Sequence, residues 1–160
     1  MFMKEKRDGT IKAWGCTDSR QQPIYTQKEE ASSPTVSLEA IMLSCSIDAK
    51  EERYMAVTNI PGAFLHADMK GTVHMILGGT IAKLIVKLEP KIYRKCIWHD
   101  KIGKSMLYVQ LNKAIYGTLQ AALLFWELLS NTHKGRGFKI NPYDHCVANK
   151  IVNRKQCTII

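Results

Sequence analysis

Apolar positions recur along the chain with two spacings, one typical of helices and one typical of strands. Helical spacing at i, i+3, i+4, i+7 and i+11 begins at Leu38 and predicts a helix over about 35–52, opened by Ser33 and Pro34. The same reasoning predicts a helix over about 118–133 that ends in the Gly135–Gly137 region. The expected buried stripes are Leu38, Ile41, Met42, Cys45 and Ala49, and Leu119, Ala122, Leu123, Trp126 and Leu129.

Short β-branched or alternating runs between turn residues predict strands. Asp8-Gly9 between polar and apolar positions predicts a two-residue hairpin turn near the N-terminus. The run YMAVTNI predicts a strand over 54–60, which Pro61-Gly62 ends because proline cannot donate to a sheet ladder. Further strands are expected at 73–77, at 106–111 and on either side of the turns at 141–144 and 153–154.

This mixture predicts an α+β fold, with a small, largely antiparallel sheet backed by the two helices. Low-complexity tracts, repeats and Pro/Gly/Ser linkers are absent, so residues 1–160 are expected to form one unit. The chain stops within an apolar run, and we therefore expect the sequence to be cut short at this end. A sheet that ended there would expose an apolar edge and favour self-association.

Composition excludes several classes of protein. With 46% hydrophobic and 23% charged residues, the chain falls within the range of ordinary globular domains. It has no apolar run near the roughly 20 residues of a membrane span and no secretory signal, so we expect an intracellular, cytoplasmic protein. Its five cysteines are odd in number and never spaced as CxxC, which argues against a disulfide framework or a zinc ribbon.

Basic residues are concentrated in the second half of the chain. Residues 1–80 carry 9 Lys and Arg against 10 Asp and Glu, whereas residues 81–160 carry 14 against 4, for an overall net charge of +9. This asymmetry suits a polyanionic partner such as nucleic acid, because phosphate contacts release counterions. Solubility alone is the other explanation of the excess.

The most regular basic pattern follows the strand predicted at 73–77. Lys83, Lys87 and Lys91 recur every four residues and would line one face of a helix, continued by Arg94 and Lys95. We interpret these five residues as a nucleic-acid-binding stripe. A plain solvated face opposite an apolar stripe is the alternative.

Three blocks of sequence, in the right order and at the right spacing, resemble the copia-type retrotransposon reverse transcriptases. SSPTVSLEAIMLSCSIDAK is similar to the family's SPVV helix, VTNIPGAFLHADM to its Asp-x-x-x-Ala-Phe-Leu-His motif, and LNKAIYGTLQAALLFW to its Leu-Tyr-Gly-x-x-Gln motif. The tail from Asn141 is similar to the hairpin that leads to the family's Tyr-Val-Asp-Asp box. The resemblance covers nearly the whole chain from about Lys4.

The resemblance implies a partial RNA-directed DNA polymerase domain. About 1–55 would be fingers-like and about 56–160 palm- and fingers-like, without the terminal Asp-Asp hairpin and the thumb. In the family, two Mg²⁺ ions held by three aspartates activate the primer, since hard ions need charged oxygens. The first aspartate position falls at Asn59, whose amide carries no charge. We therefore expect no bound metal and no polymerase activity in this chain.

The resemblance also implies which residues would contact an incoming deoxynucleotide. Phe64 would select the sugar, Gly117 and Gln120 would lie near nucleotide and template, and Lys12 would approach the triphosphate together with Arg20. Trp14 stands where the family tends to have a basic residue. Without the resemblance, Phe64 would be a core residue and Gln120 a solvated residue at a helix start.

Three functional hypotheses follow. The first is a reverse transcriptase domain that grips a template and primer as part of a retrotransposon polyprotein. The second is a non-catalytic remnant that binds nucleic acid through its basic second half. The third is an inert pseudogene product.

Overall fold

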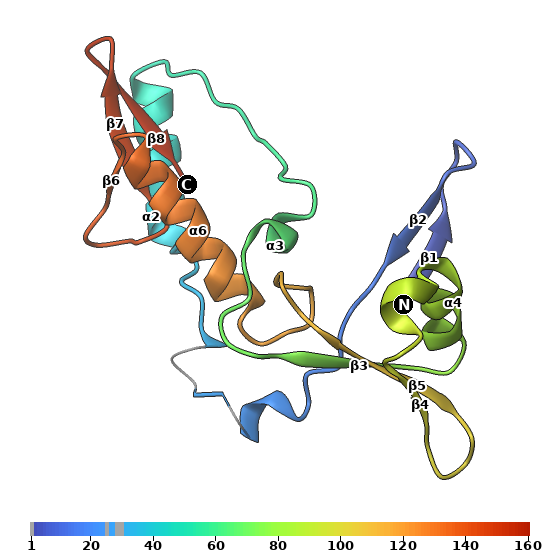
Figure 1. Cartoon of the computed structure of the whole chain (residues 1–160). Helices are drawn as coiled ribbons and strands as arrows, with labels where there is room; N and C mark the ends of the chain where they lie inside the picture. The colour runs from blue at the N-terminus through green and yellow to red at the C-terminus, as the bar shows by residue number, and fades with distance from the viewer. Residues whose placement is uncertain (1, 25, 28–30) are drawn as a thin grey trace.

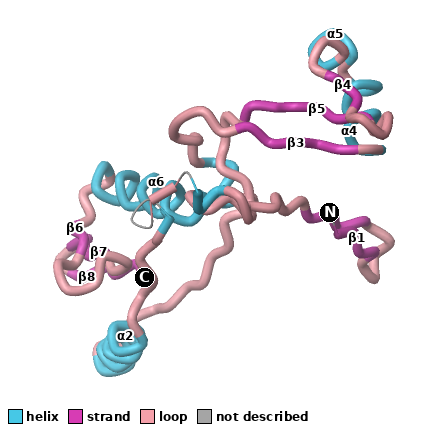
Figure 2. Tube along the Cα trace, turned by 90° about the horizontal axis from the view of Figure 1, so that it is seen from below, coloured by secondary structure: helices cyan, strands magenta, loops and turns pink. Residues whose placement is uncertain are grey.

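The computed structural model describes residues 2–24, 26–27 and 31–160, and in this part of the chain it mixes helices with antiparallel sheets. The predicted α+β class is therefore confirmed. The strands form three separate sheets, with the orders β1-β2, β3-β5-β4 and β6-β7-β8, instead of the single predicted sheet backed by two helices. Figures 1 and 2 show β6–β8 with α6 at one end and β1–β5 with α4 at the other.

The first sheet is the predicted N-terminal hairpin. Strands β1 (Phe2–Glu5) and β2 (Ile11–Trp14) pair antiparallel, with Lys4 opposite Lys12. The Lys6 N–H donates to the Thr10 carbonyl, so the loop holds three residues instead of the two predicted. Gly9 has φ +77°, and the Asp8 carboxylate accepts from the Thr10 N–H and hydroxyl. A three-residue loop that ends in a left-handed glycine is a common hairpin solution.

The second sheet contains the strands predicted near 73–77 and 106–111. Strand β3 (His74–Gly78) and the short β4 (Ile97–His99) both pair with the central β5 (Ser105–Gln110). Helices α4 (Thr80–Leu88) and α5 (Pro90–Tyr93) connect β3 to β4. Ala82 of α4 and Leu107 of β5 have no solvent exposure, so α4 covers one face of this sheet.

A small core lies where the second sheet continues toward α3 (Ala63–His66). The β3–β5 pairing extends past the strand ends, because the Leu111 N–H donates to Val73 and the Ala114 N–H to Ala67. The core consists of Ala67, Ala114, Ala121 and Leu124, with Phe64 and Met69 packed against it. Three of its four buried residues are alanines, so the core holds little apolar volume.

Helix α6 (Ala121–Gly135) joins this core to the third sheet. The helix begins three residues later than predicted, and its end at Gly135 agrees with the expected terminator region. Its buried residues are Ala121, Leu124 and Ser130, whereas Ala122 of the predicted stripe is exposed. The observed buried residues differ from the predicted stripe because α6 packs on α3 at one end and on β6 at the other.

The third sheet agrees with the strands and turns predicted for the C-terminal segment. Its strands are β6 (Lys139–Ile140), β7 (Ala148–Val152) and β8 (Lys155–Ile159). Asn153 and Arg154 both have positive φ, at 50° and 65°, which is the geometry of a tight two-residue hairpin turn.

Helix α2 (Leu38–Lys50) lies within the range predicted for the first helix, but its start and its packing differ. The cap is Ser37, whose hydroxyl accepts from the Ala40 N–H at 3.2 Å, instead of the Ser33-Pro34 start. Leu38 and Met42 of the predicted buried stripe are exposed. Figure 2 shows α2 set apart from α6 and from the third sheet, so no described element covers that stripe.

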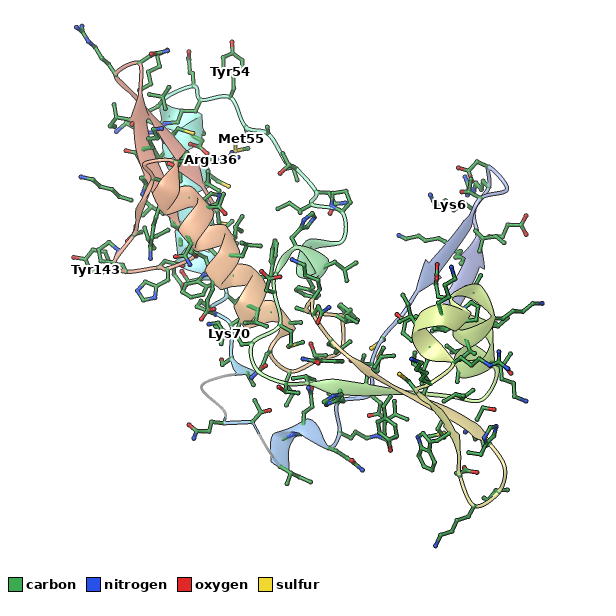
Figure 3. All side chains as sticks on the ribbon, in the orientation of Figure 1. Lys6, Tyr54, Met55, Lys70, Arg136 and Tyr143 are labelled. Carbon is green, nitrogen blue, oxygen red and sulfur yellow. The ribbon has the colours of Figure 1, made fainter. Side chains whose placement is uncertain are left out.

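The segment predicted as a strand over 54–60 is an exposed connection without secondary structure. Tyr54 and Val57 are fully exposed, and Figure 3 shows Tyr54 on the outer side of this connection. The segment has the β-branched composition of a strand, but a strand also needs a neighbouring strand to satisfy its N–H and C=O groups. In the described structure, no strand lies beside residues 54–60.

The described elements leave much of the chain in contact with solvent. The accessible surface is 12975 Å², whereas a compact monomer of 18.1 kDa exposes roughly 8100 Å². A short 3-10 helix, η1 (Gln22–Ile24), lies in the loop predicted over 15–34. None of the helices in the described ranges has both the length and the apolar character needed to span a bilayer.

The position of α2 depends on a carboxylate from the loop between β6 and β7. Asp144 accepts from the Ser37 N–H at 2.9 Å and from the Ser37 hydroxyl at 3.0 Å, and its other oxygen accepts from the Cys146 N–H. These hydrogen bonds, with the Ser37 N–H first, lower the pKa of Asp144 below its ordinary 3.8. The ionised form is therefore favoured in the folded chain.

We predict that Asp144→Ala lowers the free energy of unfolding above about pH 4, where wild-type Asp144 is ionised in both states. The difference from wild type shrinks as the pH falls through the lowered pKa of Asp144, because the wild type then loses the same stabilisation. Urea titrations from pH 3 to 7 measure this difference. A difference that stays constant over this range would contradict the assigned role of the charge.

Candidate nucleic-acid interface

Three of the residues predicted to contact a nucleotide lie close together at the start of α6. The Phe64 ring stacks on Tyr116 with centroids 5.8 Å apart and meets Phe125 edge-on at 6.1 Å. Gly117 follows Tyr116 directly, and Gln120 is the residue before α6. The structure thus brings Phe64, Gly117 and Gln120 to one place.

Phe64 has the contacts of a core residue. Its ring packs against the small core of Ala67, Ala114, Ala121 and Leu124 as well as against two aromatic rings. Phe64 is half-buried by these contacts. The alternative interpretation of Phe64 as a packing residue therefore accounts for its observed surroundings.

Gly117 allows the N-terminal segment to approach the start of α6. Its φ is +97°, and a Cβ built on it would lie 2.4 Å from the Thr17 carbonyl oxygen and 2.7 Å from Cys16 Sγ. The Thr17 N–H donates to the Tyr116 carbonyl at 3.0 Å, and Gln22 Oε1 accepts from the Leu119 N–H at 2.9 Å. Two segments about 100 residues apart in sequence are joined here.

An open groove of about 1100 Å³ runs from this junction along β3. Gln120 lines it together with Gln22 and three basic side chains, Arg20, Lys70 and His74. Arg20 forms an ion pair with Asp18, and this contact lowers the pKa of Asp18 and raises that of Arg20. Lys70 forms an ion pair with Glu127 at 2.5 Å. Much of the positive charge of the groove is therefore balanced locally.

Lys12 lies away from this junction. It is on β2, in the hairpin that extends away from α3 and α6, with Lys6 at the hairpin tip (Figures 1 and 3). A shallow hollow of about 470 Å³ is lined by Lys12, its cross-strand partner Lys4, Lys6 and Arg7, together with one acid, Glu5. Sequence reasoning missed this group, although the period-two spacing of Lys4 and Lys6 was a usable signal. The side chain of Trp14 lies outside the described part.

Asn59 lies on the exposed connection before α3 and is itself exposed. Asp68, the next carboxylate along the chain, forms an ion pair with Lys113 at 2.6 Å. Across the described ranges, no group of three or more His, Cys, Asp or Glu side chains could hold a metal ion. The donor set at Asn59 therefore does not fit the magnesium pair that the resemblance implies, because two divalent ions repel unless several carboxylates surround them.

The predicted basic stripe is exposed along its whole length, but it does not lie on one helix. Lys83 and Lys87 are four residues apart on α4, whereas Lys91 lies on α5. Glu89, with φ −130° and ψ 70°, separates the two helices and breaks the predicted spacing. Arg94 and Lys95 follow α5 and are also exposed. Lys83, Lys87, Lys91, Arg94 and Lys95 are called the basic set below.

Comparison with known proteins leaves the family unassigned. No family model matches the chain, and neither the curated proteins nor the solved structures give a significant match. The resemblance to the copia-type reverse transcriptases therefore rests on the sequence blocks quoted above.

We predict that Gly117→Ala lowers the free energy of unfolding by about 2 kcal/mol or more, because a Cβ meets both an unfavourable φ and the backbone of Thr17. Gly103→Ala is the matched control, since Gly103 has φ +78° but no atom within 4 Å of an added Cβ. Its cost is the backbone strain alone, about 1 kcal/mol. Urea denaturation measures both, and equal destabilisation would show that the close approach of Thr17 contributes nothing.

Proposed function

We propose that this chain is a reverse transcriptase domain of the copia-type retrotransposon family that binds nucleic acid without polymerising it. The three motif blocks support the family, and the exposed basic set supports the binding. The partners that follow from this proposal are an RNA or DNA template-primer and the remainder of a retrotransposon polyprotein. A deoxynucleotide is the family's third ligand.

The proposed binding rests on the exposure and the unpaired charges of the basic set. All five side chains are exposed, and none of them forms an ion pair with an acid in the described part of the chain. Their charges are therefore available to phosphates. Counterion release when phosphates bind drives an association that does not depend on base sequence.

The proposed lack of synthesis rests on charge at residue 59. An amide at this position cannot neutralise magnesium, and Asp68 already forms an ion pair with Lys113. A merely inert product remains the competing hypothesis, and it differs from our proposal in having no affinity for nucleic acid. Self-association is a further proposal, supported by the exposed apolar side chains of residues 54–60.

We predict salt-sensitive binding of single-stranded oligonucleotides, and a lower salt dependence when the basic set is replaced by alanine. The slope of log K against log salt should fall in magnitude by up to about 3.5, at about 0.7 for each phosphate that the five-residue variant no longer neutralises. Fluorescence anisotropy at several salt concentrations measures it. Lys139→Ala with Lys155→Ala is the control, because both residues are exposed on the third sheet, outside the basic set. An unchanged slope in the variant with five replacements would refute the assigned interface.

We further predict that the 160-residue chain does not extend a primer on an RNA template with Mg²⁺, and that Asn59→Asp alone does not restore extension. One carboxylate leaves the metal pair without its other ligands. Incorporation of labelled deoxynucleotide is the measurement. Primer extension by the wild-type chain or by the Asn59→Asp variant, above the level of a heat-inactivated sample, would contradict this prediction.

A further inference from the structure

The second sheet has one face covered by α4 and one face open. Ser105 and Leu107 of β5 are buried on the α4 side. Successive side chains of a strand point to opposite faces, so Met106 and Tyr108 lie on the other side. Of the described helices, α4 is the one that packs on β3 and β5, so the opposite face of the sheet is left without a covering helix.

Two aromatic rings stack on each other on this open face. Trp98 of β4 pairs with Met106 and therefore shares its face with Tyr108, two residues further along β5. The rings of Trp98 and Tyr108 are 5.7 Å apart between centroids and 14° from parallel. They remain 41% and 45% exposed. Ile76, the cross-strand partner of Tyr108 on β3, adds an exposed apolar side chain beside them.

A lysine amino group lies over the same face. Gly78 pairs with Met106, and a Cβ on Gly78 would lie 3.4 Å from Lys104 Cε and 3.7 Å from Lys104 Nζ. The Lys104 stem thus lies over Gly78 at ordinary contact distance. The acid nearest in sequence, Asp100, has one oxygen directed into the β4–β5 turn, where it accepts from the Ile102 and Lys104 N–H groups.

Further cations lie next to Trp98 along the chain. Arg94 and Lys95 of the basic set connect α5 to β4, within four residues of Trp98. Lys95 and Trp98 are therefore at most about 11 Å apart at their Cα atoms. Positively charged groups therefore lie near the stacked rings. Lys104 lies over the same face of the sheet, and Arg94 and Lys95 precede Trp98 in the sequence.

We propose that the Trp98–Tyr108 pair is a stacking site for unpaired bases of single-stranded nucleic acid, with Lys104, Arg94 and Lys95 on the adjoining phosphates. The inference rests on the proposed nucleic-acid binding and assigns it a second kind of interaction. A base adds to the outer face of an exposed ring whatever its identity, because every base has a π-face. Duplex bases are already stacked on each other, so the site favours single strands.

The test compares two probes on the full chain, oligo-dT of about twelve nucleotides and an abasic backbone of equal length, which keeps the phosphates and removes the bases. Wild type should bind oligo-dT roughly 5- to 100-fold more tightly than the abasic probe, the range expected for one stacked base. Trp98→Ala and Tyr108→Ala should remove this preference and leave the affinity for the abasic probe unchanged.

Three variants separate stacking from structural effects. Trp98→Phe and Tyr108→Phe keep an aromatic ring and should retain the preference for oligo-dT. Tyr143→Ala is the matched control, since Tyr143 is an aromatic residue that is 97% exposed at the other end of the molecule (Figure 3). This variant should behave as wild type. If Trp98→Ala also weakens abasic binding, the rings support the sheet and the stacking assignment is wrong.

Failure of this inference is distinguishable from failure of the proposed function. Equal, salt-sensitive binding of both probes by wild type would overturn the stacking site and leave the nucleic-acid interface standing. Absence of binding at low salt would overturn both. If Trp98→Ala abolishes self-association in sedimentation and leaves oligo-dT affinity unchanged, the open face is an interface between copies of this chain, and the inference is again refuted.

Discussion

The described structure depends on the junction at which Thr17 meets Tyr116 and Gly117. Here the N-terminal segment, α3, the extended β3–β5 pairing and the start of α6 come together. Backbone hydrogen bonds join Thr17 to Tyr116 and Ala114 to Ala67, and the rings of Phe64 and Tyr116 stack on each other. Gly117 makes this approach possible, because any side chain at that position would occupy the space of the Thr17 backbone. The elements on either side of the junction pack mainly with their own neighbours.

The small core at this junction explains why the charged and aromatic surfaces stay open. Alanines contribute little apolar volume, so few elements pack against this core. The three sheets remain separate. Each sheet consequently keeps a face or an edge in solvent. The open face of the second sheet and the exposed basic set belong to the same region of the molecule, where the β4–β5 hairpin follows α5 directly.

The candidate site is predictable from the sequence only in part. Phe64 belongs to one block of sequence and Gly117 and Gln120 to another, and the structure brings the two blocks to one junction. Lys12 does not join them, because its hairpin extends away from α6. The basic set is exposed as predicted, but its single-helix geometry is wrong, since Glu89 interrupts the helix before Lys91. The Trp98–Tyr108 pair escapes prediction because its two rings meet through the register of β4 against β5, which no local spacing encodes.

The sequence by itself determined the local elements of this protein. The position, though not the length, of the Asp8-Gly9 turn follows from turn chemistry, as does the Asn153-Arg154 turn. Helix α4, the end of α6 and the strands β3, β5, β7 and β8 follow from periodicity over a few neighbouring residues. Only the tertiary structure decided that residues 54–60 remain without a partner strand, that the stripe of α2 stays exposed and that three sheets form instead of one. Periodicity states which side of an element is apolar, whereas burial requires a second surface supplied by residues far along the chain.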